Sequence, residues 1–223
     1  MSDRWTLIGV GRLIHDVADA IAARGGILER VVLDRDVDEK VLGRLASEVV
    51  VTRQPALLGF QPTSPCHGFG FSDPRKEHLL AVLEPMGLVF PPIQHPMAWV
   101  SPRAVLGRGV FVGAQAAVGA LARVGDWSVI NRGATVGHDS ELGAGVRLHP
   151  GATVAGMSIL GDRVVVGAGA TVIDGIRIGD DVVLGAGAVA TGNLLEAGTY
   201  VGVPARRVWG RLSSGGPTAC GGP

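Results

Sequence analysis

The chain has few of the residues that would point to a secreted or membrane protein. Its 223 residues include only two cysteines, Cys66 and Cys220, too few for a disulfide framework, which favours a reducing cytoplasm. Long hydrophobic runs and a basic leader are both lacking. Neither charge dominates, with 20 basic and 20 acidic residues, so nothing indicates a nucleic-acid surface. We expect a cytoplasmic protein with no membrane and no nucleic-acid partner.

An unbroken six-residue period runs through the second half of the sequence. From Leu106 to Leu184 every sixth residue is aliphatic, and the residue after each of these is usually glycine. The residue four positions after each aliphatic one is small or β-branched. Each hexad is one short strand and a corner, and it cannot bury its apolar side chain alone. The period therefore predicts a β-solenoid, in which stacked repeats bury a continuous core.

The rest of the chain predicts two further parts. We expect a small α/β, Rossmann-like domain over residues 1–95, the solenoid over 96–205, and a short cap with a disordered tail over 206–223. Apolar spacing and glycines predict a β-α-β unit at the start. The predicted strands are 5–9, 27–33 and 48–52, and the predicted helices are 13–23, 38–46, 74–86 and 206–212.

One corner of the predicted solenoid holds an unusual residue. In known solenoids of this period three hexads make one coil, so residues eighteen apart stack. His138 then lies between Ala120 and Gly156, with Asp174 further along the column, and small neighbours would leave a slot beside its imidazole. Histidine can accept a proton at neutral pH, and the adjacent Asp139 can orient it. A surface histidine at a corner is the simpler alternative.

At these residues the sequence resembles a known family. The run from Ile130 to Asp139, Pro150-Gly-Ala, Gly156 and the closing Val201-Gly-Val-Pro-Ala-Arg206 resemble the hexapeptide-repeat sugar O- and N-acetyltransferases of the sialic acid and bacillosamine type. The resemblance covers about half the chain. It implies a left-handed parallel β-helix, a homotrimer with sites between subunits, and acetyl-CoA as co-substrate without a metal.

The resemblance also implies roles for individual residues. His138 would be the general base for acetyl transfer to an amino or hydroxyl group of a sugar, with Asp139 as its supporting acid. As the acceptor attacks the thioester of acetyl-CoA, the carbonyl oxygen becomes an oxyanion. Hydrogen-bond donors would stabilise it, most simply a backbone N–H near Gly156. Arg206 and Arg207 are candidates for the CoA phosphates, because guanidinium pairs well with phosphate; solvated charges on a terminal helix are the simpler alternative. The implied CoA contacts are Gly156, Ala168, Ala186, Gly202, Val203, Pro204 and Ala205.

The acceptor site departs from the family pattern. The family commonly has a second histidine nine residues after the catalytic one, where this chain has Arg147. His149 follows, in the column of Asn131. The family's Gly-rich turn carries a histidine where this chain has Arg12. Such a turn can still bind phosphate through its backbone N–H groups. The expected acceptor, a nucleotide-linked amino sugar, is therefore inferred from the resemblance and is not specified by these residues. The candidate acceptor-binding residues are Gly9, Gly11, Arg12, Asp34, Asn131, Arg147 and His149.

Other functions are compatible with a solenoid. A γ-class carbonic anhydrase needs three histidine ligands for zinc. Here His138 and His149 are eleven apart, and Pro102 and Gly113 stand thirty-six residues upstream of them. Three nitrogen ligands cannot be assembled at tetrahedral geometry from these positions, so we reject this class. A non-catalytic scaffold and an acyltransferase with a non-nucleotide acceptor remain open, as does the choice between N- and O-acetylation.

Overall fold

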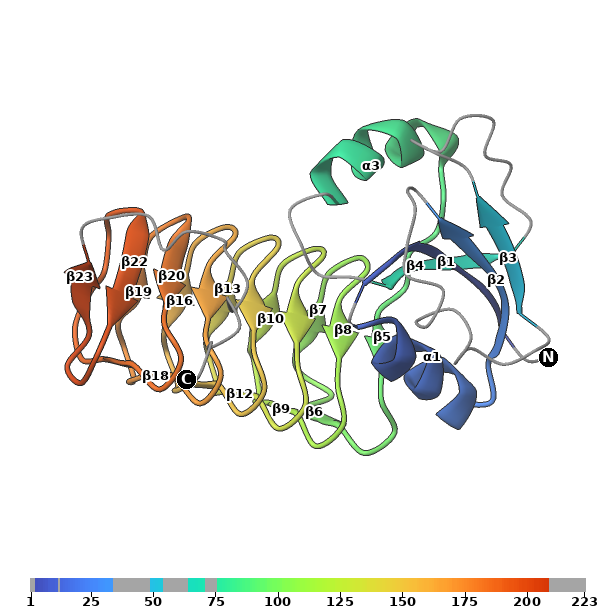
Figure 1. Ribbon diagram of the computed structural model, residues 1–223. Helices are drawn as coiled ribbons and strands as arrows, with labels where there is room; N and C mark the ends of the chain where they lie inside the picture. The colour runs from blue at the N-terminus through green and yellow to red at the C-terminus, as the bar shows by residue number, and fades with distance from the viewer. Residues whose placement is uncertain (1–2, 12, 34–48, 54–63, 71–75, 209–223) are drawn as a thin grey trace, which may run out of the picture.

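The computed structural model describes residues 3–11, 13–33, 49–53, 64–70 and 76–208. A small α/β domain sits at one end of a long parallel β-helix (Figure 1). Both parts of the predicted architecture are thereby confirmed. No helix in the described segments is long and apolar enough to cross a membrane.

The N-terminal domain is a four-stranded parallel sheet in the order β3-β2-β1-β4. Its predicted β-α-β start and the helical region before residue 86 are confirmed, whereas β4 was not predicted. The predicted helix 38–46 lies outside the described residues. The elements are β1 (Arg4–Val10), α1 (Ile14–Ala23), β2 (Ile27–Leu33), β3 (Val50–Arg53), β4 (Cys66–Gly70), α3 (Lys76–Leu83) and the 3-10 turn η2 (Glu84–Met86).

Helix α1 packs between the sheet and the solenoid. Its buried residues recur at helical spacing and form one apolar stripe: Ile14, Val17, Ala20 and Ile21. This stripe packs in one cluster with Leu7 and Val31 of the sheet and with Phe111 and Val129 of the solenoid. The opposite face of the sheet packs with α3 and with Trp127. The two parts therefore share continuous apolar packing.

The solenoid has three parallel faces. We call them the first, second and third face in the order in which the chain visits them. The first face contains β5 (Ile93–Gln94), β8 (Phe111–Val112), β11 (Val129–Ile130), β14 (Arg147–Leu148), β17 (Val165–Val166), β20 (Val182–Leu184), β22 (Gly198–Val201) and β23 (Arg206–Val208). The second contains β6 (Trp99–Val100), β9 (Ala117–Val118), β12 (Thr135–Val136), β15 (Thr153–Val154), β18 (Thr171–Val172) and β21 (Val189–Ala190). The third contains β7 (Val105–Leu106), β10 (Arg123–Val124), β13 (Glu141–Leu142), β16 (Ile159–Leu160) and β19 (Arg177–Ile178).

The pairing register confirms the predicted stacking. Thr135 pairs with Thr153 and Val136 with Val154, so residues eighteen apart are neighbours. In the strands from β8 to β19 the second residue points inward and contributes to one long core. We call the turns after first-, second- and third-face strands the first, second and third corners. In one coil these are residues 131–134, 137–140 and 143–146.

The C-terminal end of the solenoid differs from the prediction. The predicted capping helix 206–212 is wrong, because Arg206–Val208 form β23, antiparallel to β22. At the end of a solenoid β22 would expose unpaired backbone groups, and the chain turns back at residues 202–205 to pair them. Residues 209–223, including the predicted disordered tail, lie outside the described residues. The first strand of the solenoid, β5, begins at Ile93, ahead of the expected boundary.

Candidate active site

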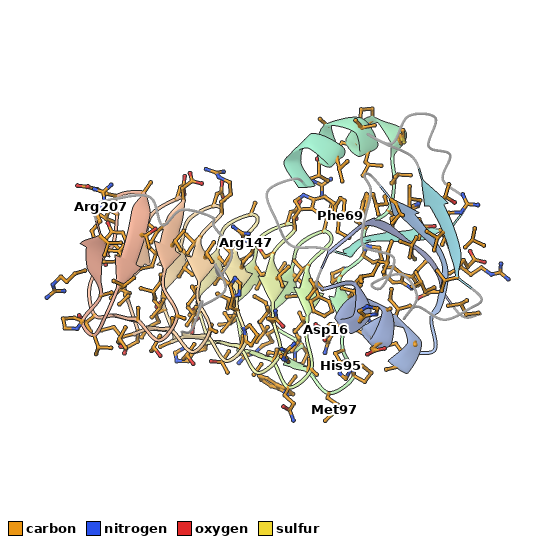
Figure 2. All side chains as sticks on the ribbon, viewed as in Figure 1. Asp16, Phe69, His95, Met97, Arg147 and Arg207 are labelled. Atoms are coloured by element: carbon orange, nitrogen blue, oxygen red, sulfur yellow. The ribbon has the colours of Figure 1, made fainter. Side chains whose placement is uncertain are left out.

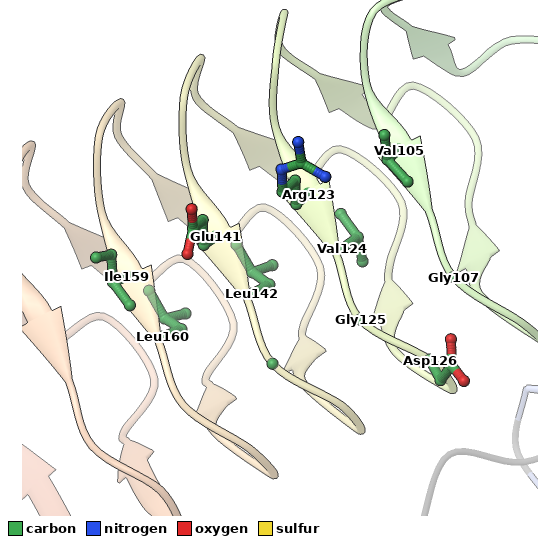
Figure 3. Close-up of a pocket in the computed structure, with 11 residues that line it drawn as sticks. Val105, Gly107, Arg123, Val124, Gly125, Asp126, Glu141, Leu142, Ile159 and Leu160 are labelled. Carbon is green, nitrogen blue, oxygen red and sulfur yellow. The ribbon is translucent and has the colours of Figure 1, made fainter.

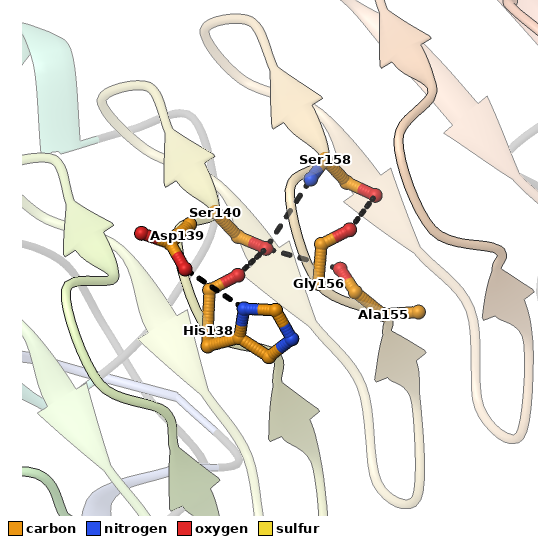
Figure 4. A network of polar contacts seen from close by, with 6 residues as sticks. All are labelled: His138, Asp139, Ser140, Ala155, Gly156 and Ser158. Carbon is orange, nitrogen blue, oxygen red and sulfur yellow. Dashed lines mark hydrogen bonds and ion pairs between the residues drawn. The ribbon is translucent and has the colours of Figure 1, made fainter.

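His138 lies at the second corner, in the turn between β12 and β13, with Asp139 beside it. The imidazole Nδ1 is 2.8 Å from Asp139 Oδ2 (Figure 4). Asp139 has a φ of 56°, a left-handed conformation that aspartate tolerates better than most residues. With the proton on Nδ1 and donated to the carboxylate, Nε2 keeps its lone pair, which is the arrangement of an oriented general base. Both side chains are largely exposed.

Gly156 lies one coil beyond His138 and in contact with its ring. A Cβ on Gly156 would be 2.8 Å from His138 Nε2 and 3.0 Å from Cε1. Such distances are too short for a side chain to fit without moving the imidazole. The small residue expected on this side of His138 is thus present. On this side of the column the imidazole itself occupies the space that the small residue leaves.

The backbone N–H of Gly156 is an open donor beside this ring. At the third corner the equivalent N–H groups are bound by aspartates one coil on. Arg108 N donates to Asp126 Oδ1 at 2.8 Å, and Ala144 N donates to Asp162 Oδ1 at 2.8 Å. Among the described residues, no hydrogen bond from Gly156 N is found. A donor left open next to a candidate base suits stabilisation of a developing oxyanion.

Two buried serines, Ser140 and Ser158, support the corner from inside. Ser140 Oγ donates to Ala155 O at 3.0 Å, and Ser158 Oγ donates to Ile173 O at 3.0 Å. The Ser158 N–H also donates to Ser140 Oγ at 3.4 Å (Figure 4). The serines thereby tie successive second corners together. These serines were not predicted from the sequence, although two serines eighteen residues apart, where most repeats have an apolar residue, are a visible signal.

Four of the other candidate residues lie at the first corner. Asn131, His149, Ala168 and Ala186 follow first-face strands, and Arg147 is on β14. The second face separates them from His138 within one chain. Asn131 Oδ1 accepts the N–H of Arg132 at 2.8 Å. Partial burial of the ring and the nearby charge of Arg147 both lower the pKa of His149, which favours a neutral imidazole at pH 7.

The candidate CoA contacts near the C-terminus lie at the far end of the second face. They form the turn from β22 to β23, namely Gly202, Val203, Pro204 and Ala205. Val189 N donates to Gly202 O at 3.0 Å, and Ala205 N donates to Val189 O at 2.7 Å. Arg206 donates to Ala205 O, while Arg207 pairs with Glu196. Arg207 is therefore held by the protein itself.

The Gly-rich turn of the N-terminal domain follows β1. Gly9 has a φ of 71°, which glycine adopts at little cost. Gly11 O accepts the N–H of Ile14 at 3.2 Å at the start of α1. Two candidate acceptor-binding residues, Arg12 and Asp34, lie outside the described residues.

A hollow of about 320 Å³ lies over the third face (Figure 3). Its outward side chains include Arg123, Glu141 and Ile159. Because it contains neither His138 nor Gly156, it is separate from the candidate base. Within the described segments, no three His, Cys, Asp or Glu side chains are grouped closely enough to hold a metal ion.

Comparison with known proteins shows the family of this chain. Residues 157–192 match the family model described as bacterial transferase hexapeptide (six repeats). One similar solved structure is a histidine-to-asparagine variant of perosamine N-acetyltransferase from Caulobacter crescentus in complex with CoA and GDP-perosamine. Its sequence is 31% identical to this chain, and the TM-score is 0.81. The match covers 92% of this chain and 97% of that one. The acetyltransferase domain of PglB from Neisseria gonorrhoeae, in complex with acetyl coenzyme A, is 29% identical, with a TM-score of 0.82 and coverage of 93% and 100%. Comparison with curated proteins finds no match. Similarity over almost the whole of both chains, together with the repeat, shows that this chain belongs to the hexapeptide-repeat acetyltransferase family.

Proposed function

We propose that this acetyltransferase transfers the acetyl group of acetyl-CoA to the amino group of a nucleotide-linked amino sugar. The observation that carries the proposal is the second corner, where His138, held by Asp139, lies against Gly156, whose N–H makes no hydrogen bond within the described residues. The substrate class is supported by the similarity to an enzyme crystallised with CoA and GDP-perosamine, which extends through the N-terminal domain.

The residues at this corner account for each step of the transfer. The acceptor amine attacks the thioester carbonyl carbon while His138 Nε2 removes its proton, and Asp139 stabilises the imidazolium that forms. The carbonyl oxygen becomes an oxyanion that accepts a hydrogen bond from Gly156 N. The tetrahedral intermediate then collapses and the carbon–sulfur bond breaks. The leaving thiolate of CoA takes the proton from His138, which restores the neutral base.

We propose that the enzyme is a homotrimer packed through the second face. The outward residues of this face carry no charge: Trp99, Ala117, Thr135, Thr153, Thr171 and Val189. Trp99 is 59% exposed in the single chain. The third face instead presents the charged Arg123, Glu141 and Arg177, and the start of the first face is covered by α1. An uncharged face is the one most readily buried in a symmetric assembly.

This assembly would complete the active site. With second faces packed around a threefold axis, the first corner of one subunit lies against the second corner of the next. Ala168 and Ala186 of one subunit and Gly156 of its neighbour would then line the same groove for acetyl-CoA. Gly202, Val203, Pro204 and Ala205 would contact its adenine end and Arg206 its phosphates. The acceptor would lie on Gly9, Gly11, Arg12 and Asp34, with its sugar near Asn131, Arg147 and His149.

Release of the CoA thiol is the direct test of this function. We expect release with GDP- or UDP-linked amino sugars and little with matching sugars that have a hydroxyl in place of the amine. Release with the hydroxyl sugar would show O-acetylation, and release with free amino sugars alone would show a non-nucleotide acceptor. No release with any acceptor in the panel would contradict an acetyltransferase acting on sugars.

His138 is tested in the same assay. We expect His138→Ala to lower kcat by roughly 10² to 10⁴-fold, the usual contribution of a general base, while acetyl-CoA still binds. In the perosamine enzyme, variants of one histidine have been crystallised with both CoA and GDP-perosamine. An unchanged kcat in His138→Ala would remove this residue from the mechanism.

A further inference from the structure

Arg132 is an exception in its column of the solenoid. It occupies the second position of a first corner, where the residues eighteen apart are Pro96, Ala114, Pro150, Ala168 and Ala186. These neighbours are small or rigid and carry no charge. Arg132 therefore places an isolated cation on a corner that is otherwise uncharged at this position. It is also next to Asn131, whose side-chain oxygen binds the Arg132 N–H at 2.8 Å.

The guanidinium of Arg132 reaches from the solenoid to the N-terminal domain. Its Nη1 is 3.6 Å from Asp16 Oδ2, on the first turn of α1. This distance is longer than a hydrogen bond, and the side chains are 62% and 45% exposed. Exposed pairs of this kind contribute little to stability. The pair holds Arg132 loosely and leaves most of its donors available.

The contact brings Arg132 close to the Gly-rich turn. Helix α1 follows that turn directly, since Ile14 N donates to Gly11 O. The same helix packs on Phe111 and Val129 of the first face, and Val129 is on β11, the strand that leads into Arg132. Asp16 lies at the solenoid side of α1 in Figure 2. Arg132 thus stands where the N-terminal domain meets the first corner.

We propose that Arg132 binds a phosphate of the nucleotide-linked acceptor and gives the enzyme its preference for nucleotide-linked over free amino sugars. This inference rests on the proposed function. A guanidinium binds phosphate through two parallel hydrogen bonds, which are stronger than a long contact to an exposed carboxylate. Arg132 would exchange Asp16 for the phosphate when the acceptor binds. Asp16 is then a competitor of the acceptor, not its ligand.

Steady-state kinetics of Arg132→Gln and Asp16→Asn test this role. We expect Arg132→Gln to raise KM for the nucleotide-linked amino sugar roughly 10- to 100-fold, the effect of losing one charge-assisted contact. Its kcat, its KM for acetyl-CoA and its kcat/KM for the free amino sugar should stay near wild type. Asp16→Asn should leave KM for the nucleotide-linked acceptor unchanged or lower it. Arg123→Gln, on the third face, is the matched control and should change none of these values.

A purely structural ion pair gives a different result. In that case Arg132→Gln and Asp16→Asn both break the pair and shift KM in the same direction, which would overturn the proposal. An unchanged KM in Arg132→Gln would also overturn it. Calorimetric titration with UDP and GDP separates this inference from the proposed function. If no nucleotide-linked sugar is acetylated, weaker binding of UDP or GDP to Arg132→Gln than to the wild type still supports the role of Arg132. Equal binding to both proteins overturns that role, and so does a wild type that binds neither nucleotide.

Discussion

At His138 the reactive nitrogen and the backbone of Gly156 are so close that no side chain fits between them. A Cβ at position 156 would be 2.8 Å from Nε2. The same glycine leaves its N–H open, whereas the equivalent donors at the third corner are bound by aspartates. The absence of a side chain at this one position therefore allows both the placement of the base and access to the donor.

Gly156→Ala tests this arrangement. The added methyl group would displace the imidazole, so we expect kcat to fall at least tenfold, because correct placement of base and donor contributes strongly to rate. Gly192→Ala is a suitable control, since its Cβ would meet nothing within 4 Å. Thiol release and acetyl-CoA binding should be measured for both variants. Equal activity of the two would contradict close contact between His138 and Gly156 in the working enzyme.

The sequence predicted part of this site. Spacing by eighteen residues placed His138, Ala120 and Gly156 in one column, because known solenoids with this period have three hexads in each coil. It could not show that the ring lies over Gly156, since that depends on the side-chain rotamer and on the left-handed conformation of Asp139. Nor could it show the contact of Asp16 with Arg132, which depends on how α1 packs on the solenoid.

At the scale of elements, local patterns predicted some parts and missed others. The solenoid strands and α1 carry a clear period, and they were predicted correctly. Strand β4 was missed because Cys66–Gly70 includes two glycines and lacks alternation. It forms through pairing with β1, sixty residues away in sequence. Strand β23 was missed for a similar reason, since only the open edge of β22 makes it a strand.

His67 on β4 makes the stability of this region depend on pH. The residue is buried and lies beside Phe90, with ring centroids 5.7 Å apart. Burial lowers the pKa of His67, and its backbone contact with Val89 opposes this only in part. The unfolded chain, in which histidine titrates near 6.5, therefore takes up the proton first on acidification. The free energy of unfolding should decrease as the pH falls through about 6.5 and be insensitive to this group at higher pH.

Urea unfolding of wild type and His67→Phe measures this effect. We expect stability to decline between about pH 7 and pH 5 in the wild type and less steeply in the variant, which keeps an aromatic ring without a titrating group. The lowered pKa of His149 acts in the same direction in both proteins, so the difference isolates His67. Parallel pH profiles would show that His67 does not contribute to this dependence.

At the scale of the whole molecule, the candidate base and two of the candidate CoA contacts lie at different corners of the solenoid. His138 and Gly156 are at the second corner, while Ala168 and Ala186 are at the first. The sequence alone implied a trimer only through resemblance. The fold supports the proposed trimer, because the uncharged second face lies between these corners. Packing of that face between subunits would join the two halves of the site.

Complementation between two defective variants tests this account most directly. His138→Ala removes the base from the second corner, and Ala168→Trp blocks the proposed CoA groove at the exposed first corner. Each homotrimer should be inactive. In trimers co-expressed from both chains, some interfaces combine an intact second corner from one chain with an intact first corner from the other. We predict recovery of about a quarter of wild-type thiol release, the statistical share of such interfaces. Mixed trimers that stay as inactive as both parents would contradict a site shared between subunits.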